Sequence, residues 1–454
     1  MQQQKSSLGR GSSITPIVIA AAVALSFAFP TLALAQRSSA TVYVPPSSVQ
    51  NAADAGKFAH TNYLLRTTNG QAPKGAATIP LNTFLETPAS LGCVYKLPLS
   101  GPAPAGCAPA GLVPAVHPVG GWGAIALVDA FDNPNIGTDL ITFNAAFGIP
   151  FTGGATLSRI FANGNGSCTT PPPNLGWELE ESLDVEWAHA MAPGANIYLV
   201  EACSNSYADL LYAESVAAGL VGLAGGGALS NSWGSGEFAG ETSDDLYFYV
   251  FNYPNTVYLA SAGDFGCGAA YPSSSPWVVS AGGTTVNRNL AARYTSESCW
   301  AGSGGGSSSQ ETYVTSFTQG HMGPWADYQY PIFGQASRQT PDLAFDADPA
   351  SGVYVYSQDN GGWFAVGGTS VSSPSLAGIL NIANNRLGQA KIYPVTSGGF
   401  YTNEENNLLY SQLDARTAYV KNFYDVKTGS NGCTVTTNWD YCTGVGSPRG
   451  LLGK

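Results

Sequence analysis

From residue 123 onward, the chain alternates short apolar runs with longer segments of helical periodicity. The apolar runs lie at residues 124–128, 197–201, 228–230, 257–261, 277–281 and 353–357, and they have the length of buried strands. Helical patterns cover residues 178–191, 207–220, 242–252 and 370–385. This alternation predicts an α/β fold, a doubly wound parallel sheet with helices on both faces.

In such a sheet the functional crevice lies beyond the carboxyl ends of the strands. Three polar sites follow predicted strands: Asp129, the segment 231–234 and Asp264. The chain has no internal repeat, so we expect one large domain from residue 87 to residue 454.

The first residues have the pattern of an export signal. An apolar run at 17–25 follows Lys5 and Arg10, and residues 33–35 are the small residues that a signal peptidase accepts. A membrane anchor would need roughly 20 apolar residues, and Pro16 and Pro30 bracket a shorter run. We therefore expect a signal peptide over 1–35, a secreted protein in the extracellular space or periplasm, and no membrane association afterwards.

Eight cysteines in an exported chain suggest four disulfides. Pairing of near neighbours is the simplest hypothesis: Cys93 with Cys107, Cys168 with Cys203, Cys267 with Cys299, and Cys433 with Cys442.

The charge distribution excludes some partners. The net charge is −12, so a nucleic acid or an anionic lipid surface is not an expected partner. Between Arg159 and Arg288 the chain has acids but neither Lys nor Arg. Any acid buried in that stretch has no local cation, which favours a raised pKa and proton sharing. A low charged fraction of 11% would also limit self-repulsion in acid.

Two separated stretches carry candidate chemistry. Glu180 and Asp184 are four residues apart and share one face of a predicted helix, where Glu181 is an alternative partner for Asp184 by spacing alone. Ser370 opens a helix after Gly367 and Gly368, at the positive end of a helix dipole. A serine hydroxyl becomes nucleophilic only beside a proton acceptor. The structural alternative for Ser370 is an ordinary helix cap. The structural alternative for Glu178, Glu181 and Glu186 is that they face solvent.

Together these segments resemble the sedolisins, the serine-carboxyl peptidases, and among them the kumamolisin-like bacterial members. The resemblance is carried, in order, by Glu180 and Asp184 within 180–195, by 230–234, by 261–264 and by 367–374, with flanking support at 271–276 and 281–284. It covers roughly residue 87 to the C-terminus and implies a subtilisin-like fold.

The resemblance implies Ser370 as nucleophile, Glu180 as general base and acid, and Asp184 as the carboxyl that orients Glu180. It implies Asp264 as a protonated donor to the oxyanion. The predicted function is a secreted, acid-acting serine-carboxyl endopeptidase for protein or peptide substrates, expected to be a monomer.

Asp129 is open to two interpretations. It either supports Trp233 and the acid pair as a neighbouring acid or hydrogen-bonds its own loop. It also raises a subtilisin-type alternative, which needs a histidine at the start of the following helix. His189 lies nine residues after Glu180 and points to the opposite side of the helix, and His60, His117 and His321 lack a suitable context.

The C-terminal region resembles the family's calcium site. By position, the ligands to Ca²⁺ would be the carboxylates of Asp425 and Asp440 and the main-chain carbonyls of Val426, Thr436 and Asn438. The family usually has glycine at the last two positions. A disulfide-closed loop without metal is the alternative.

One departure from the family is large. Sedolisins usually carry a long folded prosegment, whereas the segment 36–86 is polar and weakly patterned, and we interpret it as a short leader. The second hypothesis is therefore a catalytically silent protein that keeps the fold and binds peptides. Retention of all four acting residues argues against it.

Overall fold

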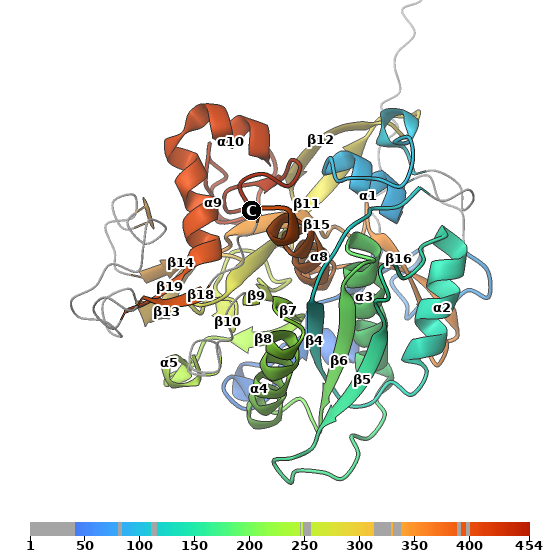
Figure 1. Ribbon diagram of the computed structural model, residues 1–454, viewed down its shortest axis with the longest axis vertical. Helices are drawn as coiled ribbons and strands as arrows, with labels where there is room; N and C mark the ends of the chain where they lie inside the picture. Colours follow the sequence, from blue (N-terminus) through green and yellow to red (C-terminus); the bar gives the residue numbers. More distant parts are fainter. Residues whose placement is uncertain are drawn as a thin grey trace, which may run out of the picture. The chain divides into compact units, whose positions relative to one another are not determined.

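The computed structural model describes residues 41–79, 84–109, 116–245, 247, 256–312, 328–329, 337–387, 392–395 and 400–454. Within this part of the chain, an eight-stranded sheet has the order β12-β11-β9-β7-β4-β6-β5, with β15 beside β11 (Figure 1). Its strands are β4 (Ala124–Ala130), β5 (Leu157–Ala162), β6 (Asn196–Ala202), β7 (Gly227–Asn231), β9 (Thr256–Ser261), β11 (Val279–Arg288), β12 (Tyr294–Cys299) and β15 (Leu343–Asp346).

The parallel pairing of these strands confirms the predicted sheet. Strands β4 and β6 pair in parallel from Ala124↔Asn196 to Ala130↔Ala202, and β12 alone pairs antiparallel, at one edge. Strand β4 is buried at every position, as a strand covered on both faces must be.

One predicted strand belongs elsewhere. Residues 353–357 form β16 (Val353–Ser357), which pairs antiparallel with β17 (Gly362–Gly367) in a separate sheet of order β1-β3-β17-β16. The connection between them is four residues long and contains Asn360 and Gly361. Such a short connection joins antiparallel strands only, because parallel strands need a crossover.

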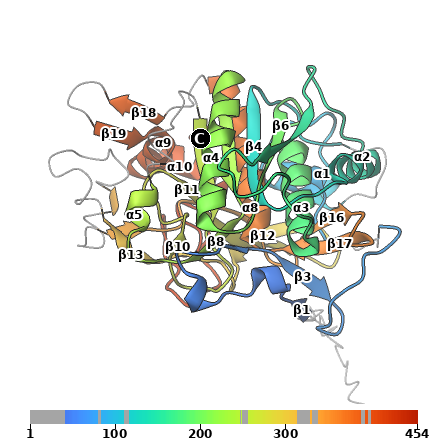
Figure 2. The ribbon, with the colours of Figure 1, turned by 90° about the horizontal axis from the view of Figure 1, so that it is seen from below.

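The helices cover both faces of the central sheet. Helices α3 (Leu175–Met191) and α8 (Thr369–Leu387) pack against each other on one face, and α4 (Tyr207–Leu223) packs against β4, β6 and β7 on the other (Figure 2). The side chain of Asn174 accepts hydrogen bonds from the first free N–H groups of α3 and so defines where that helix begins. Of the predicted helix at 242–252, the described part is α5 (Glu241–Asp244).

The predicted leader is largely built into the domain. Residues Ser39–Lys454 form one compact unit, and the predicted boundary at residue 87 is the N-cap of α1 (Pro88–Val94). Strand β3 (Leu64–Thr67) pairs with β1 (Thr41–Tyr43) and β17, and β2 (His60–Thr61) pairs with β8 (Trp233–Gly236). The predicted signal peptide, residues 1–35, lies outside the described residues.

The remaining elements are shorter or peripheral. They are α2 (Ile136–Phe147), α9 (Glu404–Asp414), α10 (Arg416–Asn422), β10 (Ala270–Tyr271), β13 (Ser307–Thr312), β14 (Ser337–Gln339), β18 (Ile392–Val395), β19 (Phe400–Asn403), β20 (Phe423–Tyr424) and β21 (Ser447–Pro448), with short 3-10 turns at Pro46–Ser48, Ala52–Asp54 and Ala105–Cys107. None of the described helices is both long enough and apolar enough to cross a membrane.

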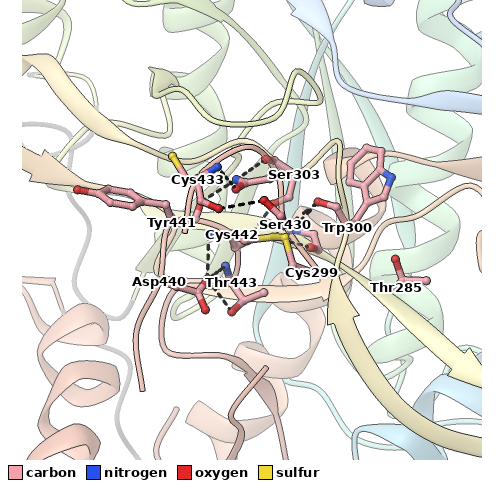
Figure 3. Close-up of a disulfide and its surroundings, with 12 residues drawn as sticks. Thr285, Cys299, Trp300, Ser303, Ser430, Cys433, Asp440, Tyr441, Cys442 and Thr443 are labelled. Carbon is pink, nitrogen blue, oxygen red and sulfur yellow. Dashed lines mark hydrogen bonds between the residues drawn. A yellow bond between two sulfur atoms is a disulfide. The ribbon is translucent and has the colours of Figure 1, made fainter. Parts of the chain in front are cut away.

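All eight cysteines are paired, and two of the four predicted pairs are wrong. Cys93–Cys107 and Cys168–Cys203 form as predicted, but Cys267 pairs with Cys433 and Cys299 pairs with Cys442. Figure 3 shows the Cys299–Cys442 bond at the end of β12. The fold brings the C-terminal loop beside β12, so proximity in space, and not in sequence, decides the partners.

Candidate functional site

Ser370 lies in the first turn of α8, immediately beyond the end of β17. Its N–H donates to the carbonyl oxygen of Asn62 at 2.9 Å, and its hydroxyl donates to the carbonyl oxygen of Ser232 at 3.2 Å. Gly368 has a φ of +111°, and a Cβ there would come within 2.2 Å of the Asn62 carbonyl oxygen. Glycine is therefore required at this position for the backbone to turn and for the segment around Asn62 to lie this close.

Glu180 and Asp184 lie one turn apart on α3, and both are fully buried. Asp184 accepts a hydrogen bond of 2.8 Å from the hydroxyl of Ser232. Neither oxygen of Glu180 has the geometry of a hydrogen bond to a described residue. The Ser370 hydroxyl is nevertheless near enough to lower the pKa of Glu180.

Burial dominates the electrostatics of this acid pair. It raises the pKa of Glu180 well above the ordinary value, and the charges of Asp184 and Asp129 raise it further. Burial also raises the pKa of Asp184, against the hydrogen bond from Ser232, which lowers it. Both pKa values are raised, as predicted for buried acids without a local Lys or Arg, and two such acids cannot both ionise at low cost.

Asp264 follows β9 and reaches the start of α8. Its Oδ1 accepts hydrogen bonds of 2.8 Å from both the N–H and the hydroxyl of Thr369. Its Oδ2 has no hydrogen-bond partner among the described residues and lies 2.6 Å from the point that a Cβ on Gly368 would occupy. Burial raises the pKa of Asp264 to about 7, while the two bonds from Thr369 lower it. The side chain is therefore protonated in acid and then able to donate.

Asp129, at the end of β4, is fully buried behind the acid pair. Its pKa is raised by burial and by the charges of Asp184 and Glu201. Trp233 is also fully buried, but its indole N–H donates to the carbonyl of Val128 at 2.8 Å and not to Asp129. Neither oxygen of Asp129 has a hydrogen-bond partner among the described residues, so Asp129 bonds neither Trp233 nor its own loop. The charge of Asp129 is one of the causes that raise the pKa of Glu180.

The interpretation of Glu178, Glu181 and Glu186 as solvent-facing residues is wrong. All three are buried, with exposed fractions of 3%, 0% and 0%. After burial, the charges of Glu201 and Asp129 raise the pKa of Glu181. The pKa of Glu180, in contrast, is among those affected by Ser370 and Asp264, so Glu180 is the acid next to the serine. Helix α3 is covered on all sides, so its polar residues are buried with its apolar ones.

The described histidines have other surroundings. His189 is buried with its ring centroid 4.0 Å from that of Phe151, and burial lowers its pKa to about 3. His60 lies 3.2 Å from Asp54, and Nδ1 of His117 is 2.8 Å from the carbonyl oxygen of Pro118. His321 lies outside the described residues. These positions argue against a subtilisin-type triad.

Three of the five calcium-ligand candidates, Asp425, Asn438 and Asp440, lie near Tyr419 on α10. Its hydroxyl donates to the carbonyl of Asn438 at 2.9 Å, and its pKa responds to the charges of Asp425 and Asp440. Oδ1 of Asp425 accepts from the N–H of Asn438, and its Oδ2 is 2.7 Å from Nζ of the half-exposed Lys427.

Asp440 accepts from the N–H groups of Cys442 and Thr443 (Figure 3). Within the described residues there is no cluster of three or more His, Cys, Asp or Glu side chains that could hold a metal. The candidate set fits Ca²⁺ in donor type, because two carboxylates and main-chain carbonyls are hard oxygen ligands. Asn438 has a φ of +75°, in the left-handed region that favours glycine and that Asn also adopts.

Three residues of the site were missed as functional candidates. Ser232 lies within the segment 230–234, and Thr369 lies directly before Ser370. Both segments carry the family resemblance, but nothing in the sequence assigned either residue a role of its own. Asn62 had no signal, because the segment around it is weakly patterned. These residues hold Asp184, Asp264 and Ser370 respectively.

The geometry brings together a hydroxyl, two buried acids one helical turn apart and a third acid with an uncommitted oxygen. Such a set is suited to nucleophilic attack on a carbonyl, with the charge that develops on its oxygen met by the Ser370 N–H and by protonated Asp264.

Comparisons with known proteins show which family the chain is similar to. No family model matches the chain. The chain is 30% identical to kumamolisin of Bacillus sp. (strain MN-32) over 343 residues, which cover 69% of the chain and 56% of kumamolisin. It is 26% identical to xanthomonalisin of Xanthomonas sp. (strain T-22) over 323 residues, covering 68% of the chain and 34% of that protein. The chain thus spans about half, or less, of the length of these relatives.

The fold is similar to that of a solved structure of Pseudomonas sedolisin, described as a serine-carboxyl proteinase complexed with two molecules of pseudo-iodotyrostatin. The TM-score is 0.58 at 20% identity, and the match covers 80% of this chain and 95% of that one. With the same fold and with sequence similarity to several sedolisin-type proteins, the chain belongs to the sedolisin family.

Proposed function

We propose that this protein is a secreted serine-carboxyl endopeptidase that hydrolyses protein or peptide substrates in acid. The observation that carries the proposal is the convergence of Ser370, Glu180, Asp184 and Asp264 in one site, from three separate segments of the chain. The names of the relatives, which include a tripeptidyl-peptidase, point to peptide bonds as the substrate.

In the proposed reaction, Ser370 attacks the scissile carbonyl and Glu180 takes its proton. A carboxylate is a weak base towards a hydroxyl, but a paired acid with a raised pKa is a better one, and general base action contributes about 10²–10⁴-fold. Asp184, held by Ser232, orients Glu180 and shares its proton. Glu180 then protonates the leaving amine, and water hydrolyses the acyl-enzyme by the same steps in reverse.

Protonated Asp264 and the N–H of Ser370 would bind the oxyanion. An oxyanion donor is typically worth about 10²–10³ in rate. Asp264 donates only below its pKa of about 7, so the proposal requires acidic conditions. The export signal and the four disulfides support secretion.

We also propose one structural Ca²⁺ held by Asp425, Val426, Thr436, Asn438 and Asp440. The supporting observation is the grouping of both carboxylates and the Asn438 carbonyl about the Tyr419 hydroxyl. The ion would supply a crosslink within the C-terminal loop and takes no part in the proposed reaction.

The test is cleavage of casein and of a quenched peptide library between about pH 3 and about pH 8. We expect activity in acid that is lost in Ser370→Ala and reduced at least a hundredfold in Glu180→Gln. Activity that peaks in alkali would contradict the acid pair. A folded protein that cleaves nothing at any pH, yet binds the library, would be a peptide-binding protein instead.

A further inference from the structure

A second group of buried acids lies directly behind the acid pair. Asp129 on β4 and Glu201 on β6 are register partners in the parallel pairing of these strands, so their side chains point to the same face of the sheet (Figure 1). Helix α3 packs on that face, and the charge of Asp184 acts on Asp129. Glu181, on the same helix, is affected after burial by the charges of Glu201 and Asp129. The carboxyls of Glu180, Asp184, Asp129, Glu181 and Glu201 are therefore neighbours, and we call the last three the rear acids.

The rear acids are enclosed, and most of their oxygens are uncommitted. Asp129, Glu181 and Glu201 are each 0% exposed. Both oxygens of Asp129, both oxygens of Glu181 and Oε2 of Glu201 have no hydrogen-bond partner among the described residues. Oε1 of Glu201 accepts the N–H of Asn133 at 3.2 Å. A buried carboxylate without donors is costly, whereas a carboxyl that carries a proton can donate it to a neighbouring acid.

The surroundings of the rear acids favour the protonated form. Burial raises the pKa of Glu201 to about 9, so this acid carries its proton throughout the acidic range. The charge of Arg159 lowers that pKa, but Nη1 of Arg159 is bound to Asp132 at 2.5 Å. Other ionisable groups surround the five carboxyls: Glu178 on α3, Asp132 after β4, Arg159 on β5, Asp264 after β9 and Tyr63 after β2.

The acid pair has a requirement that the rear acids can meet. As a base, Glu180 has to be ionised in acid, yet burial raises its pKa well above the ordinary value. A hydrogen bond donated to the ionised form lowers a pKa, and donors that are linked in a chain strengthen one another. Ser232 donates one such bond to Asp184. Protonated rear acids supply further donors on the side of the pair that faces away from Ser370.

We propose that the rear acids stay protonated and donate hydrogen bonds toward the acid pair, so that one negative charge is shared among the five carboxyls and Glu180 can act as a base in acid. Glu201 and Glu181 act through Asp129 and are positioning residues, since they do not touch the substrate. This inference rests on the proposed function and adds to it the groups that keep the base ionised.

The protons balance over the reaction. At rest, every carboxyl of the group but one carries a proton. When Glu180 takes the proton of Ser370, all of them are protonated, and the group is neutral. When Glu180 gives that proton to the leaving amine, the single negative charge returns, so no proton has to enter or leave the group during the step.

The test compares two variants of Glu201 by the pH dependence of kcat on a quenched peptide. Leucine has no donor, so in Glu201→Leu the base should ionise only at higher pH. We expect the acidic limb of kcat to move upward by about one pH unit, with kcat about tenfold lower on the acidic side of the limb. In Glu201→Gln the side chain keeps its size, accepts the N–H of Asn133 and donates through its amide, so the limb should stay near that of the unchanged protein.

Glu181→Leu and Glu181→Gln repeat the comparison at a side chain whose two oxygens have no partner among the described residues. This second pair decides the question if Glu201→Leu does not fold, and the melting temperature reports folding for all variants. Glu214→Leu is the matched control, because Glu214 is an equally buried acid on α4, bound by Nδ2 of Asn231 at 3.4 Å on the other face of the sheet. We expect its acidic limb to stay in place.

Three results would overturn the proposal. The first is an acidic limb that stays in place in the folded leucine variants of Glu201 and Glu181. The second is an equal shift in the leucine and glutamine variants, which would show that donation is not the cause. The third is a shift of the same size in Glu214→Leu, which would assign the effect to the loss of any buried acid.

Infrared absorption of protonated carboxyl groups provides a readout that needs no cleavage. At about pH 6, ordinary acids are ionised, so the remaining signal comes from acids with raised pKa values. We expect Glu201→Gln and Glu181→Gln each to lower this signal, and an unchanged signal in both would show that the rear acids are ionised and would sink the inference. If the signal falls but the protein cleaves nothing at any pH, the proposed function fails and the role in catalysis fails with it. If Ser370-dependent cleavage is present but the limb does not move, only the present inference fails.

Discussion

The carboxyl of Asp264 is bound twice by Thr369, the residue immediately before Ser370. Both the N–H and the hydroxyl of Thr369 donate to the same oxygen, each at 2.8 Å. Oδ2 of Asp264 is therefore left free of Thr369, and it can donate a hydrogen bond only when it carries a proton. The nucleophile and the oxyanion donor are thus positioned by adjacent residues of one helix start.

The first prediction concerns the alkaline limit of activity. Because burial raises the pKa of Asp264 to about 7, the donor is lost as the pH rises through about 7. We expect kcat/KM to fall across that range, measured with a quenched peptide. Asp264→Ala should lose about 10²–10³ in kcat at acidic pH.

Asp264→Asn is the matched control for this prediction. Its amide donates at every pH, so the variant should retain more activity than the alanine variant, and its alkaline limit should move upward. An unchanged alkaline limit would assign that limit to another group.

The second prediction concerns Ser232, which positions Asp184 through a hydrogen bond of 2.8 Å. We expect Ser232→Ala to lower kcat about tenfold, since a net hydrogen bond is worth about 1–1.5 kcal/mol. The hydrogen bond lowers the pKa of Asp184, so the acidic limb of the pH profile should shift upward.

Ser235→Ala, three residues after Ser232 and within β8, is the comparison. Its hydroxyl lies 2.9 Å from that of Tyr207 and does not touch the acid pair. This variant should leave the acidic limb unchanged, and a similar shift in both variants would mean that the strand, not the Asp184 bond, is responsible.

The third prediction concerns stability against pH. Glu214 is fully buried, and burial raises its pKa from 4.5 to about 8. The folded state holds this proton more tightly than the unfolded chain does, so the contribution to stability is complete below 4.5 and is lost as the pH rises through about 8.

Glu214→Gln should therefore raise the free energy of unfolding by about 1–3 kcal/mol near pH 9 and change it little near pH 4. Denaturant unfolding at the two pH values measures this. Asp414→Asn, an exposed acid, should show no such difference between the two pH values. A gain of equal size for Glu214→Gln at both pH values would exclude ionisation as the cause.

The fourth prediction concerns calcium. A chelator should lower the melting temperature by several degrees, because a ligand at about 100 times its Kd stabilises by about 2.7 kcal/mol. Asp425→Asn should abolish this response. Lys427→Ala should increase calcium affinity, since it removes the ammonium group 2.7 Å from Asp425. A melting temperature that changes with neither chelator nor added calcium would contradict the proposed calcium site.

Local rules explain why the central elements could be predicted. Strands such as Ala124–Ala130 and helices such as Leu175–Met191 have apolar runs and caps that act within a few residues. The spacing of Glu180 and Asp184 is likewise a property of one helix. These features depend on neighbours in sequence, so the pattern alone predicts them.

Long-range contacts explain the failures. Cys267 and its partner Cys433 are 166 residues apart in the sequence and lie together only in the folded domain. Glu181 and Glu186 are polar yet buried, because α3 is enclosed by other elements, and this burial raises their pKa well above the ordinary value. Residues 60–65 have a weak hydrophobic pattern, and their extended conformation is held by strand pairing with β8 and β17. Such pairing cannot be read from the segment's own sequence.

The sequence by itself determined the succession of strands and helices, the acid pair one turn apart, and the serine after two glycines, because each depends on short-range geometry. Only the tertiary structure decided that Ser232 holds Asp184, that Thr369 aims Asp264, and that Asn62 lies against Ser370. Those contacts join strands and helices far apart in the chain, and their distances are fixed by the packing of the whole domain.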